Sequence, residues 1–211
     1  MGALNIFENR AVKLTVVSPK EVALGAALGG AGALLFLFVF PKGSISTLMH
    51  VLRVPGPGSG IALVVGPFLV LVVLVSSLLS PAKGGALIAS MAFAVSYTLV
   101  VRLFGIATDP KGAFGSASFV AAIALFGLAA ETVMALSGAL SQVWQCVLTG
   151  ALANTVLLVF YWLVIFPRTV GWVKWKDIPL LTGACLVCGL VTGFVAWRVS
   201  APLARAVKEK E

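Results

Sequence analysis

Two polar side chains lie inside long apolar segments of this chain, where a polar group is costly to place. Glu131 falls within residues 114–138, and Asn154 falls within residues 143–166. A charged side chain in the middle of a membrane span costs about 2.5 to 3.5 kcal/mol on insertion scales, so it indicates a function by default. We therefore treat both as candidate substrate-binding residues. The simpler interpretation of each is a hydrogen bond between two helices.

Further candidate substrate-binding side chains lie near the ends of apolar segments. Tryptophan rings offer stacking surfaces, and an arginine is a suitable partner for a carboxylate or a phosphate. These candidates are His50, Arg53, Ser59, Arg102, Trp172 and Trp175.

His50 is the only histidine of the chain. A metal site needs several converging ligands, and no spacing around His50 supplies them, so we expect no metal and no cofactor. An exposed loop histidine is the simpler interpretation, and a single axial contact to a bound tetrapyrrole is the alternative.

The three cysteines, Cys146, Cys185 and Cys188, all fall inside apolar segments. An odd number of cysteines in such surroundings predicts small buried side chains and no disulfide framework. Cys185 and Cys188 form a CxxC, which allows a thiol redox protein as an alternative. The sequence contains no GxxxxGK[ST], HExxH or GxSxG motif, so we expect a protein that is not an enzyme.

Composition identifies the protein class. Hydrophobic residues make up 60% of the 211 residues, charged residues make up 10%, and the mean hydropathy is +1.10. Soluble domains carry about 25% charged residues. This chain is therefore predicted to be an all-α integral membrane protein. The net charge of +8 comes from basic residues at the ends of apolar runs, a distribution that suits lipid head groups and excludes nucleic acid as a partner.

Apolar runs of about 20 residues predict transmembrane helices. We expect a bundle of six, preceded by an interfacial segment at 1–20 and followed by a basic tail at 200–211. Ser18 is the expected N-cap of the first helix, with Pro19 as its first residue and Glu21 in its first turn. Lys and Arg divide eight against seven between the two sides, so charge does not set the orientation. The six predicted spans cover residues 21–40, 61–79, 86–106, 114–138, 143–166 and 178–199.

The stretch from His50 to Pro67 combines four glycines with three prolines and predicts a turn-rich loop at the mouth of the protein. Pro67 is also expected to kink the start of the second span. The first half of span one is rich in small residues, which predicts close packing against another span of this chain or against a partner subunit.

These features resemble the substrate-binding S-components of energy-coupling factor (ECF) importers. The resemblance lies in the six spans, the AxxxA of Ala23 and Ala27, the first loop through residues 55–60, the short turn at 81–85 and the segment from Gly127 to Glu131. It implies a subunit that binds a vitamin or a related small molecule in the cell membrane, with both termini in the cytoplasm.

The resemblance also implies partners and roles. Ala23 and Ala27 would face a coupling transmembrane protein that two ATPase subunits drive. The first loop would form a gate over an outer pocket, with Pro55, Gly56, Pro57, Gly58 and Gly60 as its gating residues. The other functions that the sequence allows are an assembly or anchor subunit of a larger membrane complex, the thiol redox protein, and a self-sufficient small transporter or channel.

Overall fold

The computed structural model describes residues 18–54, 58–79, 84–105, 116–137, 142–169 and 174–208. Within these ranges every regular element is a helix. Six helical spans are long and apolar enough to cross a membrane, which confirms the predicted all-α bundle and makes the chain a multi-pass membrane protein. The spans are Pro19–Val39, Ile61–Leu79, Gly85–Phe104, Ala117–Ser137, Val143–Ile165 and Trp175–Ser200.

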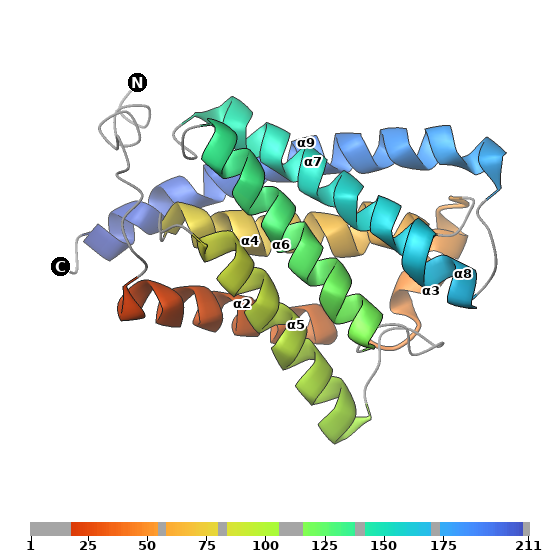
Figure 1. Ribbon diagram of the computed structural model, residues 1–211, viewed down its shortest axis with the longest axis horizontal. Coiled ribbons are helices and arrows are strands. Elements are labelled where there is room, and N and C mark those ends of the chain that lie inside the picture. The colour runs from red at the N-terminus through yellow and green to blue at the C-terminus, as the bar shows by residue number, and fades with distance from the viewer. Residues whose placement is uncertain are drawn as a thin grey trace.

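The spans are built from helices that keep the labels of Figure 1. Two spans contain a turn of π-helix, which is η1 at the start of the second span and η2 at the end of the fifth. Their bounds are α2 Pro19–Val39, η1 Ile61–Val65, α4 Gly66–Leu79, α5 Gly85–Phe104, α6 Ala117–Ser137, α7 Val143–Phe160, η2 Tyr161–Ile165 and α9 Ile178–Lys208. Shorter elements are α3 Ser44–Val51, α8 Phe166–Thr169 and the 3-10 turn η3 Trp175–Asp177.

Helix α2 begins as the sequence predicts. Ser18 is the N-cap, its side chain accepts a hydrogen bond from the backbone N–H of Glu21, and Pro19 is the first helical residue. The Glu21 carboxylate in turn accepts a hydrogen bond of 2.8 Å from the N–H of Ser18. This reciprocal capping box satisfies backbone donors that the first turn of a helix leaves unpaired. Of the predicted amino-terminal segment, residues 1–17 lie outside the described residues.

The spans alternate in direction, so the bundle has two distinct ends. In Figure 1, α2, α4 and α9 run along the long axis of the molecule, and α5, α6 and α7 cross this direction obliquely. One end holds the start of α2 and the end of α9, and we call it the terminus end. The opposite end holds α3 and α8, and we call it the α3 end. Helix α9 continues to Lys208, past residue 200, where the basic tail was expected to begin.

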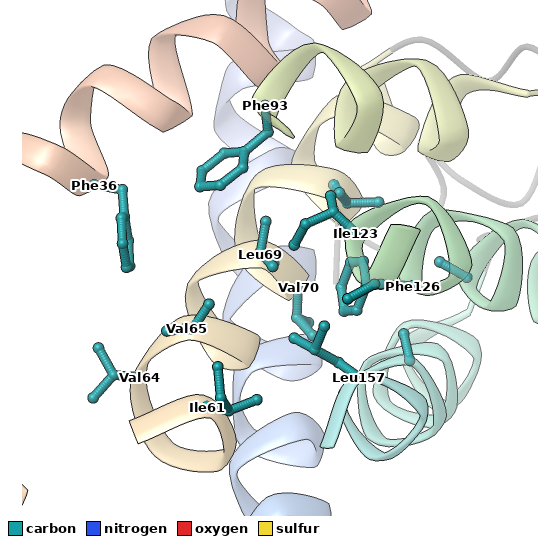
Figure 2. Packing of buried hydrophobic residues seen from close by; sticks show 14 of the residues in the cluster. Phe36, Ile61, Val64, Val65, Leu69, Val70, Phe93, Ile123, Phe126 and Leu157 are labelled. Atoms are coloured by element: carbon teal, nitrogen blue, oxygen red, sulfur yellow. The ribbon is translucent and has the colours of Figure 1, made fainter. Parts of the chain in front are cut away.

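Helix α4 is the centre of the bundle. The buried share of the most apolar stretch is 67% in the span that contains α4 and 22% in the last span. Leu69 and Val70 of α4 lie between side chains of the surrounding helices, which include Phe93, Phe126 and Leu157 (Figure 2). A helix that is apolar on all sides suits this position, because α4 contacts protein on most of its circumference.

An aromatic cluster joins α2, α4 and α5 in the half of the bundle nearer the α3 end. The rings of Phe36 and Phe68 meet edge to face at 5.1 Å between centroids. Phe93 and Tyr97, one helical turn apart on α5, lie nearly parallel with centroids 6.3 Å apart. Such pairs stabilise a core by about 0.5 to 1.5 kcal/mol beyond the area that they bury.

Glycines allow the closest helix contacts. On α9, a Cβ added at Gly189 would lie 2.6 Å from the carbonyl oxygen of Gly150 on α7. On α2, a Cβ added at Gly32 would lie 2.8 Å from the side chain of Val72 on α4. Because lipid tails are as apolar as the side chains, helices in a membrane gain most from such close backbone approach. The glycines therefore set the spacing of the bundle.

Candidate functional site

The sequence-predicted binding residues divide between the α3 end, the centre and the terminus end of the bundle. His50 lies on α3 and Arg53 directly after it, and both are exposed. Arg102 is exposed in the last turn of α5, and Trp175 is exposed at the start of η3. Those that lie at the α3 end are His50, Arg53, Ser59, Arg102 and Trp175. Trp172 and the gating residues Pro55, Gly56 and Pro57 lie outside the described residues.

Glu131 caps a neighbouring helix at the terminus end. Its carboxylate accepts a hydrogen bond of 2.6 Å from the backbone N–H of Gly84 and one of 3.2 Å from that of Ala86. A negative charge at the amino-terminal end of α5 also complements the helix dipole. Arg102 lies 16 residues further along α5 than Ala86, about 24 Å at 1.5 Å per residue. Glu131 and Arg102 are therefore not brought together, and Glu131 makes the interhelical hydrogen bond that was its simpler interpretation.

Asn154 joins three spans in the buried centre of the bundle. Its side-chain Nδ2 donates hydrogen bonds to the carbonyl oxygen of Ala62, at 3.1 Å, and to that of Cys185, at 2.8 Å. Its Oδ1 lies against Gly66, where an added Cβ would overlap it. Asn154 of α7 thus connects the start of the second span with α9.

The bond to Ala62 follows from the position of Pro67. In the π-helical turn η1 the N–H of Gly66 bonds to the carbonyl of Ile61, five residues back. The next bond in this pattern would run from residue 67 to the carbonyl of Ala62, but proline has no N–H. Asn154 supplies the missing donor. The wider turn also relieves the clash of the proline ring with the carbonyl group four residues before it. The expected kink at Pro67 therefore takes the form of a π-turn.

The predicted loop from His50 to Pro67 is consequently shorter in the structure. Helix α3 continues to Val51, and helical structure resumes at Ser59. The loop prediction was wrong for residues 50–51, which belong to α3, and for residues 59–67, because Pro67 is accommodated within a helix by the π-turn η1. The predicted start of the second span at residue 61 was right. Of the predicted gating residues, Gly60 belongs to this helical segment and lies against α3, where an added Cβ would approach Ile45 to 2.6 Å.

A second π-turn, η2, repeats the arrangement at the end of the fifth span. Here the N–H of Phe166 bonds to the carbonyl of Tyr161, and Pro167 follows at once. Gly58, in the left-handed conformation with φ of 97°, packs against the ring of Trp162 in η2. An added Cβ at Gly58 would lie 2.8 Å from the Nε1 of Trp162 and 3.0 Å from Leu158. The end of the first loop, at Gly58, therefore packs directly against η2.

Arg53 ends α3 in an unusual backbone conformation. Its N–H bonds to the carbonyl of His50 at 3.1 Å, and the N–H of Val54 bonds to that of Met49 at 3.2 Å. This pair of bonds is a Schellman motif, in which the residue with positive φ is usually glycine. Arg53 has a φ of 51° and is the one non-glycine residue with positive φ in the described part of the chain. A strained position of this kind motivates a hypothesis of function for its side chain.

Helix α2 presents two different faces of small residues. Gly25, Gly29 and Gly32 are buried against α4 and α5. Ala23 and Ala27, the predicted docking residues, are exposed. The sequence left open whether the small residues of this span pack within the chain or against a partner. The glycines pack within the chain, and the alanines face outward.

The cysteines are free and lie within the spans. Cys146 and Cys185 are buried on α7 and α9, and Cys188 is partly buried one turn after Cys185. Side chains three residues apart on a helix have Cβ atoms about 5 to 6 Å apart, whereas a disulfide needs about 3.5 to 4.5 Å. The helix therefore holds the CxxC sulfurs apart. Over the described part of the chain, no three His, Cys, Asp or Glu side chains gather closely enough to hold a metal ion.

Two features of the site were missed from sequence. One is the contact between Gly58 and Trp162, which joins residues far apart in the chain. The other is the pair of π-turns, whose signal was present: the apolar segments Ile61–Val65 and Tyr161–Ile165 are each followed by one residue and then by proline. Comparison of the chain with models of protein families, with curated proteins and with solved structures gave no match in any of the three.

Proposed function

We propose that this chain is the membrane-embedded solute-binding subunit of an ATP-driven importer, in the manner of an ECF S-component. The observation that carries the proposal is the division of α2 into a buried glycine face and an exposed alanine face. Exposed alanines let another helix approach closely. In the proposed complex Ala23 and Ala27 contact a coupling membrane protein, which two ATPase subunits drive.

The proposed ligand site is at the α3 end. Arg53 and Arg102 supply cations there for a carboxylate or phosphate, His50 adds a hydrogen-bonding ring, and Trp175 adds a stacking surface. Vitamin-sized molecules bind where apolar surface is combined with a few placed polar groups of this kind. The segment from Arg53 to Gly60 is the proposed gate. The protein resides in the cell membrane with its terminus end toward the cytoplasm.

The docking role is tested by a large side chain on the alanine face. Ala27→Trp is expected to abolish co-purification of a polytopic membrane protein and two nucleotide-binding ATPases from native membranes, identified by mass spectrometry. Val187→Trp is the matched control, because Val187 is an exposed residue of α9, on another side of the bundle. The control is expected to retain the partners. Equal recovery of the partners with Ala27→Trp would remove the docking role from α2.

Ligand binding is tested on the same preparations by native mass spectrometry of the gently solubilised protein. A bound small molecule of defined mass, retained by both variants, supports a solute-binding subunit. Partner proteins at fixed stoichiometry with no small molecule in any preparation would instead identify an assembly or anchor subunit. A ligand whose uptake is lost in a Cys185→Ser/Cys188→Ser variant that still binds it would identify a thiol redox protein.

A further inference from the structure

Helix α3 has three different faces, of which one is apolar and exposed. Ile45 and Met49 are buried, each with 7% exposure, and they anchor the helix on the start of the second span at Gly60. Val51 and Leu52 are 70% and 55% exposed, and Leu48 lies beside them one turn earlier. Helical periodicity places these residues on one side, since they are three and four residues apart. Ser46 and His50 lie on the remaining, polar side, and Arg53 follows the end of the helix.

The depth of α3 relative to the membrane follows from α2. The 21 residues of α2 have a length of about 31 Å, which matches the hydrocarbon thickness of a bilayer. Helix α3 begins at Ser44, only a few residues after α2 ends at Val39. It therefore lies close to the boundary between acyl chains and head groups. Phe38 near the end of α2 and Phe104 at the end of α5 are exposed near the same boundary, as lipid-facing side chains are.

The charged residues that flank α3 in the sequence are all basic. Residues 40–54 contain Lys42 and Arg53 and no acidic residue, and the exposed Arg102 lies at the same end of the bundle. An apolar helix face flanked by cations is the pattern of a helix that lies in the interface of a membrane with anionic lipids. A protein partner would need to complement both the exposed apolar side chains and the cations, whereas an anionic leaflet does so without any further contact.

We infer that α3 is an interfacial membrane helix that binds anionic phospholipid. Leu48, Val51 and Leu52 insert among the acyl chains, and Lys42 and Arg53 bind lipid phosphate. The polar side of α3, with Ser46 and His50, faces water. This inference does not rest on the proposed transport function, because it concerns the surface of α3 that contacts lipid and requires no ligand or partner protein.

The depth of α3 is tested with nitroxide labels in reconstituted vesicles of phosphatidylcholine with and without phosphatidylglycerol. A label at Val51→Cys is expected to collide more with oxygen, which concentrates in hydrocarbon, than with a water-soluble nickel chelate. A label at Ser46→Cys, on the polar side of the same helix, is the matched control and is expected to show the opposite preference. The wild-type protein, whose three cysteines lie within the spans, gives the background labelling.

Each other outcome overturns the inference. Equal nickel accessibility at the two positions would place the apolar face in water. Protection of the Val51 label from both reagents would show that a protein surface covers it. The lipid charge is tested by Lys42→Glu/Arg53→Glu, which is expected to move the Val51 label toward water in vesicles with phosphatidylglycerol and to have no such effect in phosphatidylcholine alone. If the depth of the Val51 label does not depend on phosphatidylglycerol when Lys42 and Arg53 are unchanged, anionic lipid has no part in the binding of α3.

Discussion

The two ends of the bundle differ in how their helices begin and end. At the terminus end, side chains cap three helices: the box of Ser18 and Glu21 on α2, the carboxylate of Glu131 on α5, and Gln145, whose Oε1 accepts a hydrogen bond from the N–H of Gln142 on α7. At the α3 end, the Ser116 side chain caps α6 by accepting a hydrogen bond of 3.2 Å from the N–H of Phe119. Left-handed backbone is more frequent there, at Gly43 before α3, at Arg53 after it and at Gly105 after α5, whereas at the terminus end it precedes α5 at Gly84.

The acidic caps follow the same division, whereas Lys and Arg lie at both ends. Both acidic caps, Glu21 and Glu131, lie at the terminus end. Among the described residues of the α3 end, Asp177 is outnumbered by cations, which include Lys42, Arg53, Arg102, Lys174 and Lys176. Carboxylates that bond to backbone N–H groups stabilise the fold, whereas exposed cations contribute little to it. The caps therefore stabilise the terminus end, and the α3 end carries the side chains that we propose for a ligand and for lipid.

The largest effect is expected at Glu131. Glu131→Ala leaves the N–H groups of Gly84 and Ala86 without their acceptor, and hydrogen bonds to a charged group contribute about 1.5 to 3 kcal/mol. We expect the free energy of unfolding to fall by about 2 to 3 kcal/mol, measured by thermal unfolding in detergent. Glu131→Gln, which keeps one acceptor, is expected to lose less. Unchanged stability of Glu131→Ala would show that the terminus end is not held by its caps.

A smaller effect is expected at Gln145, which joins the end of α6 to the start of α7 at the same end of the bundle. Its buried side chain accepts from the N–H of Gln142 at 2.9 Å and donates to the carbonyl of Ser137 at the end of α6. Gln145→Ala leaves both groups unpaired, and we expect a loss of about 1 to 3 kcal/mol in the same unfolding measurement. Leu148→Ala, at an exposed position of α7, is the control and should change stability little. Equal effects of the two substitutions would contradict a bracing role for Gln145.

Much of the fold could be predicted from the sequence because its signals are local. Apolar runs of sufficient length gave all six spans, with ends within a few residues of those observed. The start of α2 was predicted because Ser18, Pro19 and Glu21 are a capping pattern within a few adjacent residues. A membrane strengthens such signals, since every backbone polar group in a span must be paired within the helix or by a neighbour.

The arrangement around Asn154 could not be predicted because its cause is not local. Asn154 follows from Pro67 only when the two residues are known to lie together, and they are distant in the sequence. Pro167 likewise looked like the end of a span, whereas the π-turn η2 carries the helix past it to Thr169. Arg53 was singled out for its charge, but its left-handed conformation depends on how α3 ends.

The smallest effect, and the one that separates the two ends most sharply, is expected at Arg53. Left-handed backbone costs a non-glycine residue about 1 to 2 kcal/mol, and the greater freedom of glycine in the unfolded chain offsets about 0.4 to 1 kcal/mol of that. Arg53→Gly is therefore expected to stabilise the protein by about 0.5 to 1 kcal/mol in detergent, although it removes the cation proposed for ligand and lipid.

The control for this prediction is Arg53→Ala, which removes the same cation and keeps the strain. It is expected to unfold at nearly the wild-type temperature and, like Arg53→Gly, to lose occupancy by an anionic ligand in native mass spectrometry. A loss of stability of similar size in both variants would mean that the guanidinium group holds α3 in place. A side chain would then stabilise the α3 end, as Glu131 stabilises the terminus end. The strain at Arg53 would need no functional explanation.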